Sequence, residues 1–338
     1  MKRLFLLLSL LFVVSISAQD KDESTNSFFD DAAVKEYNLS TVYVGGEVAE
    51  PGEVDLTTLP LHSFPLKEVE LKDNGKYKFV GSYFCLGYSL LDIVSVKTVK
   101  KVNEEEFRPY VDLYIIVEND KGDKAVFSWG EIFYSKDNFK VILTKKVNAI
   151  NPSKMKMEWP LPDEPRIVCA NDLSDQRFIS NPTRIIVKSS TGEFATGRRD
   201  DIFSADIKLI TGGETISIAD VDKSVGVRKL THVGYGHGRG YKGVNDFEGY
   251  VFKDILNSKL HLPQEYLSKG YAIASAKDGY RVIYSISEIL NRSDMNDVLL
   301  IDHGDSPSNG RYTIMAIPDF FVDRNVRSLE KFEIRLAE

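Results

Sequence analysis

The octapeptide GYSLLDIV, residues 87–94, decides the fold, because it returns later in the chain as GYVFKDIL, residues 249–256. Further segments recur in the same chain order, and the pairs are VGGE at 44–47 with TGGE at 211–214, FSWGEI at 127–132 with YSISEI at 284–289, VIL at 141–143 with VLL at 298–300, and RFISNPTRIIV at 177–187 with RNVRSLEKFEI at 324–334. The spacing between partners decreases along the chain, as one duplicated unit with shorter loops in its second copy would produce. The sequence therefore predicts an internal duplication.

Segments of different composition surround the two copies. Lys2 and Arg3 precede an apolar run and then small residues, which is the pattern of a secretory signal peptide. The run is too short to span a bilayer comfortably, so we expect an exported protein, periplasmic or extracellular. The predicted organisation is a signal peptide at 1–18, a flexible leader at 19–39, copy one at 40–190, a linker at 191–204 and copy two at 205–338.

Charge and missing motifs disfavour several classes of function. The formal net charge is −7 and becomes more negative when Lys2 and Arg3 are removed, which disfavours nucleic acid and anionic lipid as partners but leaves small anionic ligands open. No second apolar segment of membrane length is present. The sequence also lacks the Gly-x-Ser-x-Gly, His-Glu-x-x-His, Walker and Cys-x-x-Cys motifs, so it does not support a hydrolase, a zinc protease, a nucleotide-binding protein or a thioredoxin.

Each copy is dominated by predicted strands. Residues 110–120 and 121–129 form two apolar runs around a polar turn, and their counterpart at 271–285 has Asp278-Gly279 at the turn. Short helices are predicted where apolar residues recur at helical spacing over one or two turns, at 89–94, 130–133, 253–256 and 287–290. Each copy is therefore expected to be an α+β unit with a mixed β-sheet and short helices.

This order of segments resembles the sulfite oxidase-type molybdopterin-binding domain. The resemblance rests on the Gly-x-x-Leu-x-Asp helix at 87–94, the hairpin ending in Phe-Ser-x-x-Glu-Ile at 127–132, and Arg-Phe-Ile-x-Asn-x-Thr-Arg-Ile-x-Val at 177–187. It covers nearly all of copy one and, more weakly, copy two. The family implies two tandem units that bury a molybdopterin cofactor between loops, with a cysteine thiolate on the metal and basic or polar residues on the pterin phosphate.

The residue that the family uses to bind the metal is missing from its usual place. The ligand cysteine belongs in a loop well upstream of the Gly-x-x-Leu-x-Asp helix, whereas Cys85 lies two residues before Gly87 and Cys169 lies in a predicted core strand. Copy two has no cysteine, and whether Cys85 and Cys169 form a disulfide is left open. The family's basic residue after Arg-Phe-Ile is Ser180 in copy one but Arg327 in copy two. The resemblance thus implies phosphate contact only in copy two.

The stretch THVGYGHGRGYKG, residues 231–243, stands in copy two where the metal ligand would be expected. If this stretch is extended, alternate residues share a face, and the four side chains between the glycines project together. The bare glycine face would let a ring or a backbone come close, which suits a flat ligand that carries a phosphate or carboxylate. The candidate binding residues are Tyr235, His237, Arg239 and Tyr241, together with Arg327.

Other interpretations compete with a ligand site at this stretch. The glycine-rich strand could pack against the neighbouring copy and bind nothing. A metal site is disfavoured, because His232 has the opposite parity from His237 and would point away from it. The loop Asp302-His303-Gly304-Asp305 places another imidazole between carboxylates, a grouping suited to proton transfer or metal binding. If the fold places this loop beside the stretch at 231–243, His303 and His237 are expected to belong to one site.

Three functions fit these patterns. The preferred one is an exported ligand-binding or interaction module that keeps the molybdopterin-binding fold without the metal-ligand cysteine and takes a small anionic or pterin-like ligand, with no catalytic residue and no metal site assigned. The first alternative is a molybdopterin-dependent oxidoreductase with a non-standard site. The second is an envelope scaffold whose duplicated sheets mediate protein contacts. A polar pocket around His237, Arg239 and Arg327 is expected for the first two functions and is not needed for the third.

Overall fold

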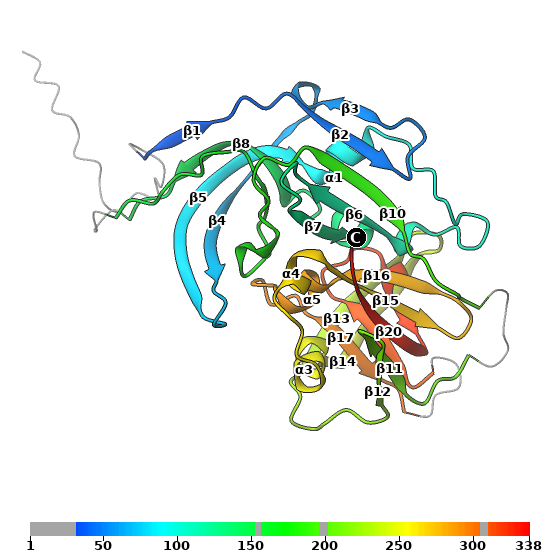
Figure 1. Ribbon diagram of the computed structural model, residues 1–338. Coiled ribbons are helices and arrows are strands. Elements are labelled where there is room, and N and C mark those ends of the chain that lie inside the picture. Colours follow the sequence, from blue (N-terminus) through cyan, green and yellow to red (C-terminus); the bar gives the residue numbers. More distant parts are fainter. Residues whose placement is uncertain (1–31, 153–156, 196–201, 305–309) are drawn as a thin grey trace, which may run out of the picture.

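The structure, a computed structural model, describes residues 32–152, 157–195, 202–304 and 310–338. The predicted signal peptide and most of the predicted leader lie outside the described residues. The end of the leader was wrongly predicted to be flexible, because Val34–Glu36 pairs with a strand of the first sheet and Tyr37 is buried. Within the described ranges the chain belongs to the α+β class: its strands form four small β-sheets, and its helices are few and short (Figure 1).

Strands β1 to β10 form two sheets, and we call this part of the chain the first half. One sheet has the order β1 (Val34–Glu36), β8 (Val141–Ala149), β5 (Tyr77–Ser89) and β4 (Leu61–Leu71), with β9 (Ile167–Cys169) also paired to β8. The other has the order β3 (Gly52–Asp55), β2 (Thr41–Gly46), β10 (Arg184–Ser189), β6 (Leu113–Glu118) and β7 (Lys124–Ser128). The helices are α1 (Leu90–Ser95) and α2 (Trp129–Phe133), with 3-10 turns η1 (Leu56–Thr58), η2 (Tyr110–Asp112) and η3 (Asp175–Arg177).

Strands β11 to β20 form the other two sheets, and we call this part the second half. One sheet has the order β12 (Glu214–Ile218), β11 (Ile207–Thr211), β20 (Leu329–Leu336), β15 (Gly270–Ala276) and β16 (Arg281–Ser285). The other has the order β13 (Val227–Gly236), β14 (Gly240–Val251), β17 (Val298–Asp302), β18 (Tyr312–Ala316) and β19 (Val326–Arg327). The helices are α3 (Phe252–Lys259), α4 (Glu265–Lys269) and α5 (Ile286–Leu290), with the 3-10 turn η4 (Val322–Arg324).

The two halves share a strand order. The order β3-β2-β10-β6-β7 in the first half corresponds to β12-β11-β20-β15-β16 in the second. In each of these sheets the strand that comes first in the chain pairs in parallel with the strand that comes last, β2 with β10 and β11 with β20. Register agrees as well, because Tyr88 lies opposite Leu143 and Tyr250 lies opposite Leu300, which are residues that the sequence repeat also matches. Topology and register therefore contain the same internal repeat as the sequence.

The four predicted helical segments are helical in the structure. At the start of α2, the Ser128 hydroxyl accepts a hydrogen bond from the Glu131 N–H, and the Glu131 carboxylate accepts one from the Ser128 N–H. Ser285 and Glu288 form the same reciprocal pair at α5. Such capping boxes satisfy N–H groups that have no partner inside the helix, which helps a helix of five residues to persist. The longest helix among the described residues, α3 (Phe252–Lys259), has eight residues, which is too short to span a bilayer.

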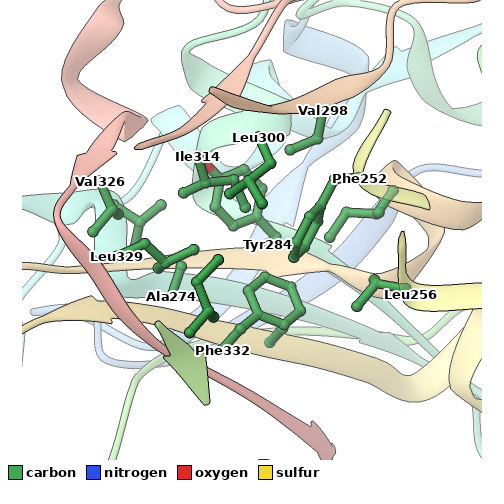
Figure 2. Packing of buried hydrophobic residues seen from close by; sticks show 14 of the residues in the cluster. Phe252, Leu256, Ala274, Tyr284, Val298, Leu300, Ile314, Val326, Leu329 and Phe332 are labelled. Atoms are coloured by element: carbon green, nitrogen blue, oxygen red, sulfur yellow. The ribbon is translucent and has the colours of Figure 1, made fainter. Parts of the chain in front are cut away.

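Each half has an apolar core between its two sheets. Figure 2 shows the core of the second half, where Tyr284 and Phe332 from one sheet meet Leu300 and Ile314 from the other. The core of the first half is formed in the same way by residues that include Val44, Leu113, Phe127, Leu143 and Ile167. Each half is therefore a pair of sheets packed around its own interior.

The halves also pack against each other, through the sheets that contain β6 and β7 on one side and β15 and β16 on the other. Tyr114 stacks on Tyr271, with ring centroids 4.5 Å apart and ring planes at 15°. These two tyrosines occupy matching positions, because Tyr114 lies opposite Ser128 and Tyr271 lies opposite Ser285. A surface that packs against its own repeat is the arrangement of a two-fold dimer, here within one chain.

Candidate functional site

The stretch at 231–243 is a β-hairpin, not one extended strand. Strand β13 ends at Gly236, β14 begins at Gly240, and these two glycines face each other across the turn. Gly240 has a φ of +66°, a left-handed conformation that is costly for residues with a side chain. The prediction that four side chains share one face is therefore wrong, because the chain reverses direction between Gly236 and Gly240.

Three of the candidate binding residues lie outside the cavity that this hairpin borders. Tyr235 and Tyr241 are cross-strand partners on the outer face of the hairpin, with 40% and 65% of their surface exposed. His237 packs edge-on against Phe321, with centroids 5.3 Å apart, and its backbone N–H donates to Asp323 Oδ2 at 2.7 Å. His237 therefore anchors the tip of the hairpin, while the two tyrosines form part of the outer surface.

The inner face of the hairpin borders a cavity of about 660 Å³. His232 and Gly234 face this cavity from β13, and Arg239 and Lys242 reach it from the turn and from β14. Residues of the neighbouring strands and of the η4 segment complete the wall, among them Ile301, His303, Thr313, Met315, Asp323 and Arg327. The structure thus brings two of the predicted binding residues, Arg239 and Arg327, to one cavity.

Cationic side chains outnumber carboxylates by one among the described residues that line the cavity. Arg239, Lys242 and Arg327 are solvent-exposed, and none of them forms an ion pair with another residue in the described part of the chain. Two carboxylates, Asp278 and Asp323, also line the cavity, but Asp323 already accepts a backbone hydrogen bond from the hairpin tip. Three cations against two carboxylates favour an anion at this surface.

Two histidines line the cavity, and sequence reasoning had set one of them aside. His232 does point away from His237, but the side to which it points is the cavity. Burial lowers the pKa of His232 and also that of His303, whose Nε2 lies 3.0 Å from Thr313 Oγ1. Burial therefore favours the neutral form of both imidazoles. In the sequence, the alternating glycines indicate this face of β13, because a strand face without side chains leaves room for a ligand or another backbone.

The chain does not provide a thiolate at this cavity. Both cysteines are free and buried in the first half, and neither lines the cavity. Burial raises the pKa of Cys85 to about 12 and raises that of Cys169 as well. Among the described residues, no group of three or more histidine, cysteine, aspartate or glutamate side chains is placed to hold a metal ion. The residues present therefore do not fit a thiolate-bound molybdenum.

The corresponding place in the first half is filled by an internal ion pair. When the β4–β5 hairpin is aligned with the β13–β14 hairpin, Glu68 takes the position of Gly234. When the pair β8–β9 is aligned with β17–β18, Arg166 takes the position of Thr313. Arg166 donates to both carboxylate oxygens of Glu68, and the two side chains are 11% and 6% exposed. The guanidinium also lies over the ring of Tyr83, 5.9 Å from its centroid. The first half therefore satisfies its arginine with a carboxylate from its own chain.

The second half carries its arginine on the adjacent strand. Ser180 pairs with Arg166 in the first half, and Arg327 pairs with Thr313 in the second. The two halves thus have one arginine each at this strand pair, on opposite strands. In the first half the arginine is buried and paired, whereas Arg327 is exposed and has no carboxylate partner in the described chain.

Comparisons with known proteins assign no family. No family model and no curated protein matches this chain. Among solved structures, the sulfane dehydrogenase SoxCD from Paracoccus pantotrophus is similar over 88% of this chain and 78% of that chain, with 11% identical residues and a TM-score of 0.31. A similarity of this size assigns neither a fold nor an activity.

Proposed function

We propose that the second half binds a small anionic ligand in the cavity beside the β13–β14 hairpin. The observation that carries this proposal is the convergence of Arg239, Lys242 and Arg327 on one cavity, without an ion pair to any described residue. Cations gathered around a concave surface raise the local concentration of anions and bind carboxylates and phosphates through charge-assisted hydrogen bonds. The cavity has no thiolate, so its lining favours binding of an anion over a molybdenum centre held by cysteine.

The difference between the halves supports a ligand site in the second half alone. In the first half, the carboxylate of Glu68 neutralises Arg166 inside the fold. In the second half, the position of that carboxylate is Gly234, while the positive charge is retained at Arg327. The carboxylate or phosphate of a ligand would supply the negative charge that Glu68 supplies in the first half.

The remaining lining suggests a ligand with a flat or apolar body. Phe247, Ile301 and Met315 contribute apolar surface, and the neutral His232 and His303 offer hydrogen bonds without charge. A planar molecule with one anionic group, of which a pterin-like compound is an example, would use both kinds of wall. The shared strand order of the halves and the resemblance of their motifs support tandem units related to the sulfite oxidase-type domain as the architecture behind this site.

The test is a binding screen by thermal shift and isothermal titration calorimetry with phosphate, benzoate, phenyl phosphate and a pterin carboxylate. We expect at least one of these anions to bind, and Arg327→Ser and Lys242→Gln each to weaken that binding by about tenfold or more, since a charge-assisted hydrogen bond contributes on the order of 1.5–3 kcal/mol. Lys208→Gln, an exposed lysine of β11 outside the cavity, is the control. The proposal would be refuted if Lys208→Gln weakened binding as much as Arg327→Ser and Lys242→Gln do, or if the wild-type protein bound none of these anions.

A protein-contact function has one observation in its favour. The outer face of the same hairpin exposes a cluster of large apolar side chains, which are Val233, Tyr235, Tyr241, Val244 and the neighbouring Phe320. Exposed apolar clusters commonly mark interaction surfaces. Tyr235→Ser with Tyr241→Ser would abolish recruitment of a partner while leaving anion binding unchanged, whereas Arg327→Ser would do the reverse. The two functions are therefore separable on two faces of one hairpin.

We also propose that the protein is exported, on the strength of the pattern in residues 1–18. The measurement is N-terminal sequencing of the mature protein from the producing cell's exported fraction. A mature chain that begins at Gln19 is expected. Recovery of the chain with Lys2 and Arg3 still attached, from the cytoplasm alone, would contradict export.

A further inference from the structure

One wall of the cavity continues directly into the interface between the halves. Val322, Asp323, Asn325 and Arg327, in the segment from η4 through β19, line the cavity. Arg324 stands in the middle of this segment but does not line the cavity, and it is fully buried. Residues on both sides of Arg324 therefore face the cavity, while Arg324 itself points into the interior.

Arg324 is held by acceptors from both halves. Its guanidinium donates to Asp319 at 2.6 and 2.9 Å and to Glu288 at 2.8 and 3.1 Å, and its Nη1 also donates to Ser128 Oγ of the first half at 2.9 Å. Gly130, also of the first half, lies so close that a Cβ there would be 1.9 Å from Arg324 Cδ. Glycine is therefore required at position 130 for Arg324 to lie where it does.

Arg177 repeats this arrangement in the other direction. It donates to Asp172 at 2.6 and 2.8 Å, to Glu131 at 2.9 and 3.0 Å, and across the interface to Ser285 Oγ at 3.2 Å. In each half, a helix-capping serine thus accepts a hydrogen bond from the arginine of the other half. Arg177 borders no part of the anion cavity, so it offers a matched control for Arg324.

We propose that the first half fixes the wall of the anion cavity, with Arg324 as the positioning residue and with Ser128 and Gly130 as its support from the other half. The effect on binding rests on the proposed function, while the effect on the wall itself does not. The donors of a guanidinium have a fixed geometry, and here they are bound to acceptors on three separate segments. A shift of Arg324 would move Asp323 and Asn325, the cavity residues on either side of it.

The test compares Arg324→Lys with Arg177→Lys in the full-length protein. We measure the affinity for phenyl phosphate by calorimetry and the amide hydrogen exchange of residues 322–327. Arg324→Lys should weaken binding by about tenfold and speed exchange in this segment, since a misplaced wall loses part of its contact with the ligand. Arg177→Lys should lower the melting temperature to a similar extent and change neither readout. Ser128→Ala is a milder variant with the same expected direction, should Arg324→Lys not fold.

The outcomes separate the two proposals. Equal changes in affinity and in exchange for both arginine variants would overturn the positioning role, because general loosening of the interface would then explain them. Failure of wild type to bind phenyl phosphate or any other anion of the screen would refute the anion site. In that case the exchange of residues 322–327 alone decides whether Arg324 holds this segment.

Discussion

Gly234 stands where the first half has Glu68, and this difference separates the cavity from its packed counterpart. We predict that Gly234→Glu removes anion binding, because the new carboxylate would pair with the adjacent Lys242 or with Arg239 inside the cavity. The affinity for phenyl phosphate should fall by more than about tenfold, as isothermal titration calorimetry would measure.

Gly234→Ala is the matched control for this change. A Cβ at position 234 would lie 3.2 Å from Lys242 Cβ, a contact that a small shift of the lysine relieves, and alanine adds no charge. Binding should therefore survive in the alanine variant. Equal loss in both variants would mean that volume and not charge closes the cavity, which would contradict the comparison with Glu68.

At the residue scale, the structure brings two of the predicted binding residues to the proposed site. Arg239 and Arg327 line the cavity, and Arg327 was predicted from the family resemblance, as the basic residue that copy one replaces with Ser180. His237 was misplaced because alternation along a strand holds only while the strand continues, and a turn at glycine ends it. His232 was set aside by the same rule, which correctly separated it from His237 but could not say which face was concave.

Among the helices, α2 and α5 differ from α1 in what their N-cap serines bind. Ser128 and Ser285 cap their helices and each also accepts a hydrogen bond from an arginine of the opposite half, whereas Ser89 caps α1 without an arginine. Replacing an N-cap serine by alanine costs about 1 kcal/mol. We predict about 1 kcal/mol for Ser89→Ala and about 2 kcal/mol for Ser128→Ala and Ser285→Ala, since these two also leave a buried charged donor with one acceptor fewer.

Urea unfolding followed by circular dichroism would measure these free energies. The midpoint should decrease in the order wild type, Ser89→Ala, then the two interface variants. Equal losses for all three serines would show that the bonds to Arg324 and Arg177 add nothing to the stability of the halves in contact.

Most elements could be predicted from the repeat, because each short segment was supported by its counterpart. The helices at 89–94 and 130–133 are examples, since neither is long enough to be assigned by its own periodicity. The hairpin at 231–243 had no such support. Its counterpart, β4 with β5, turns around a different loop at 72–76 and carries none of the glycine alternation.

At the scale of the molecule, what the sequence could not reveal is the exchange of arginine contacts between the halves. The repeat matches Arg177 with Arg324, but a match within a sequence does not say that each side chain crosses to the other copy. That depends on the two-fold packing around Tyr114 and Tyr271. Once the halves pack in this way, the matched motifs become one shared buried cluster.

This cluster holds more negative than positive groups. Four carboxylates share two guanidinium groups in the interface, and its members are Glu131, Asp172, Arg177, Glu288, Asp319 and Arg324. Burial raises the pKa of Glu131 to about 7 against the attraction of Arg177, and it also raises the pKa of Asp319. A buried cluster with excess negative charge binds protons more readily than the unfolded chain does.

Stability should therefore decrease as pH rises through the window that Glu131 sets. Between its ordinary pKa of 4.5 and about 7, the folded protein keeps a proton on Glu131 that the unfolded chain has released, so the free energy of unfolding falls with pH. This group would contribute a loss of up to about 3 kcal/mol across the window. Glu131→Gln should remove this part of the slope in urea titrations from pH 4.5 to 7.5, whereas Glu104→Gln, at an exposed position, should keep it. An unchanged slope in Glu131→Gln would mean that Arg177 keeps Glu131 ionised throughout, and that the proton resides elsewhere in the shared cluster.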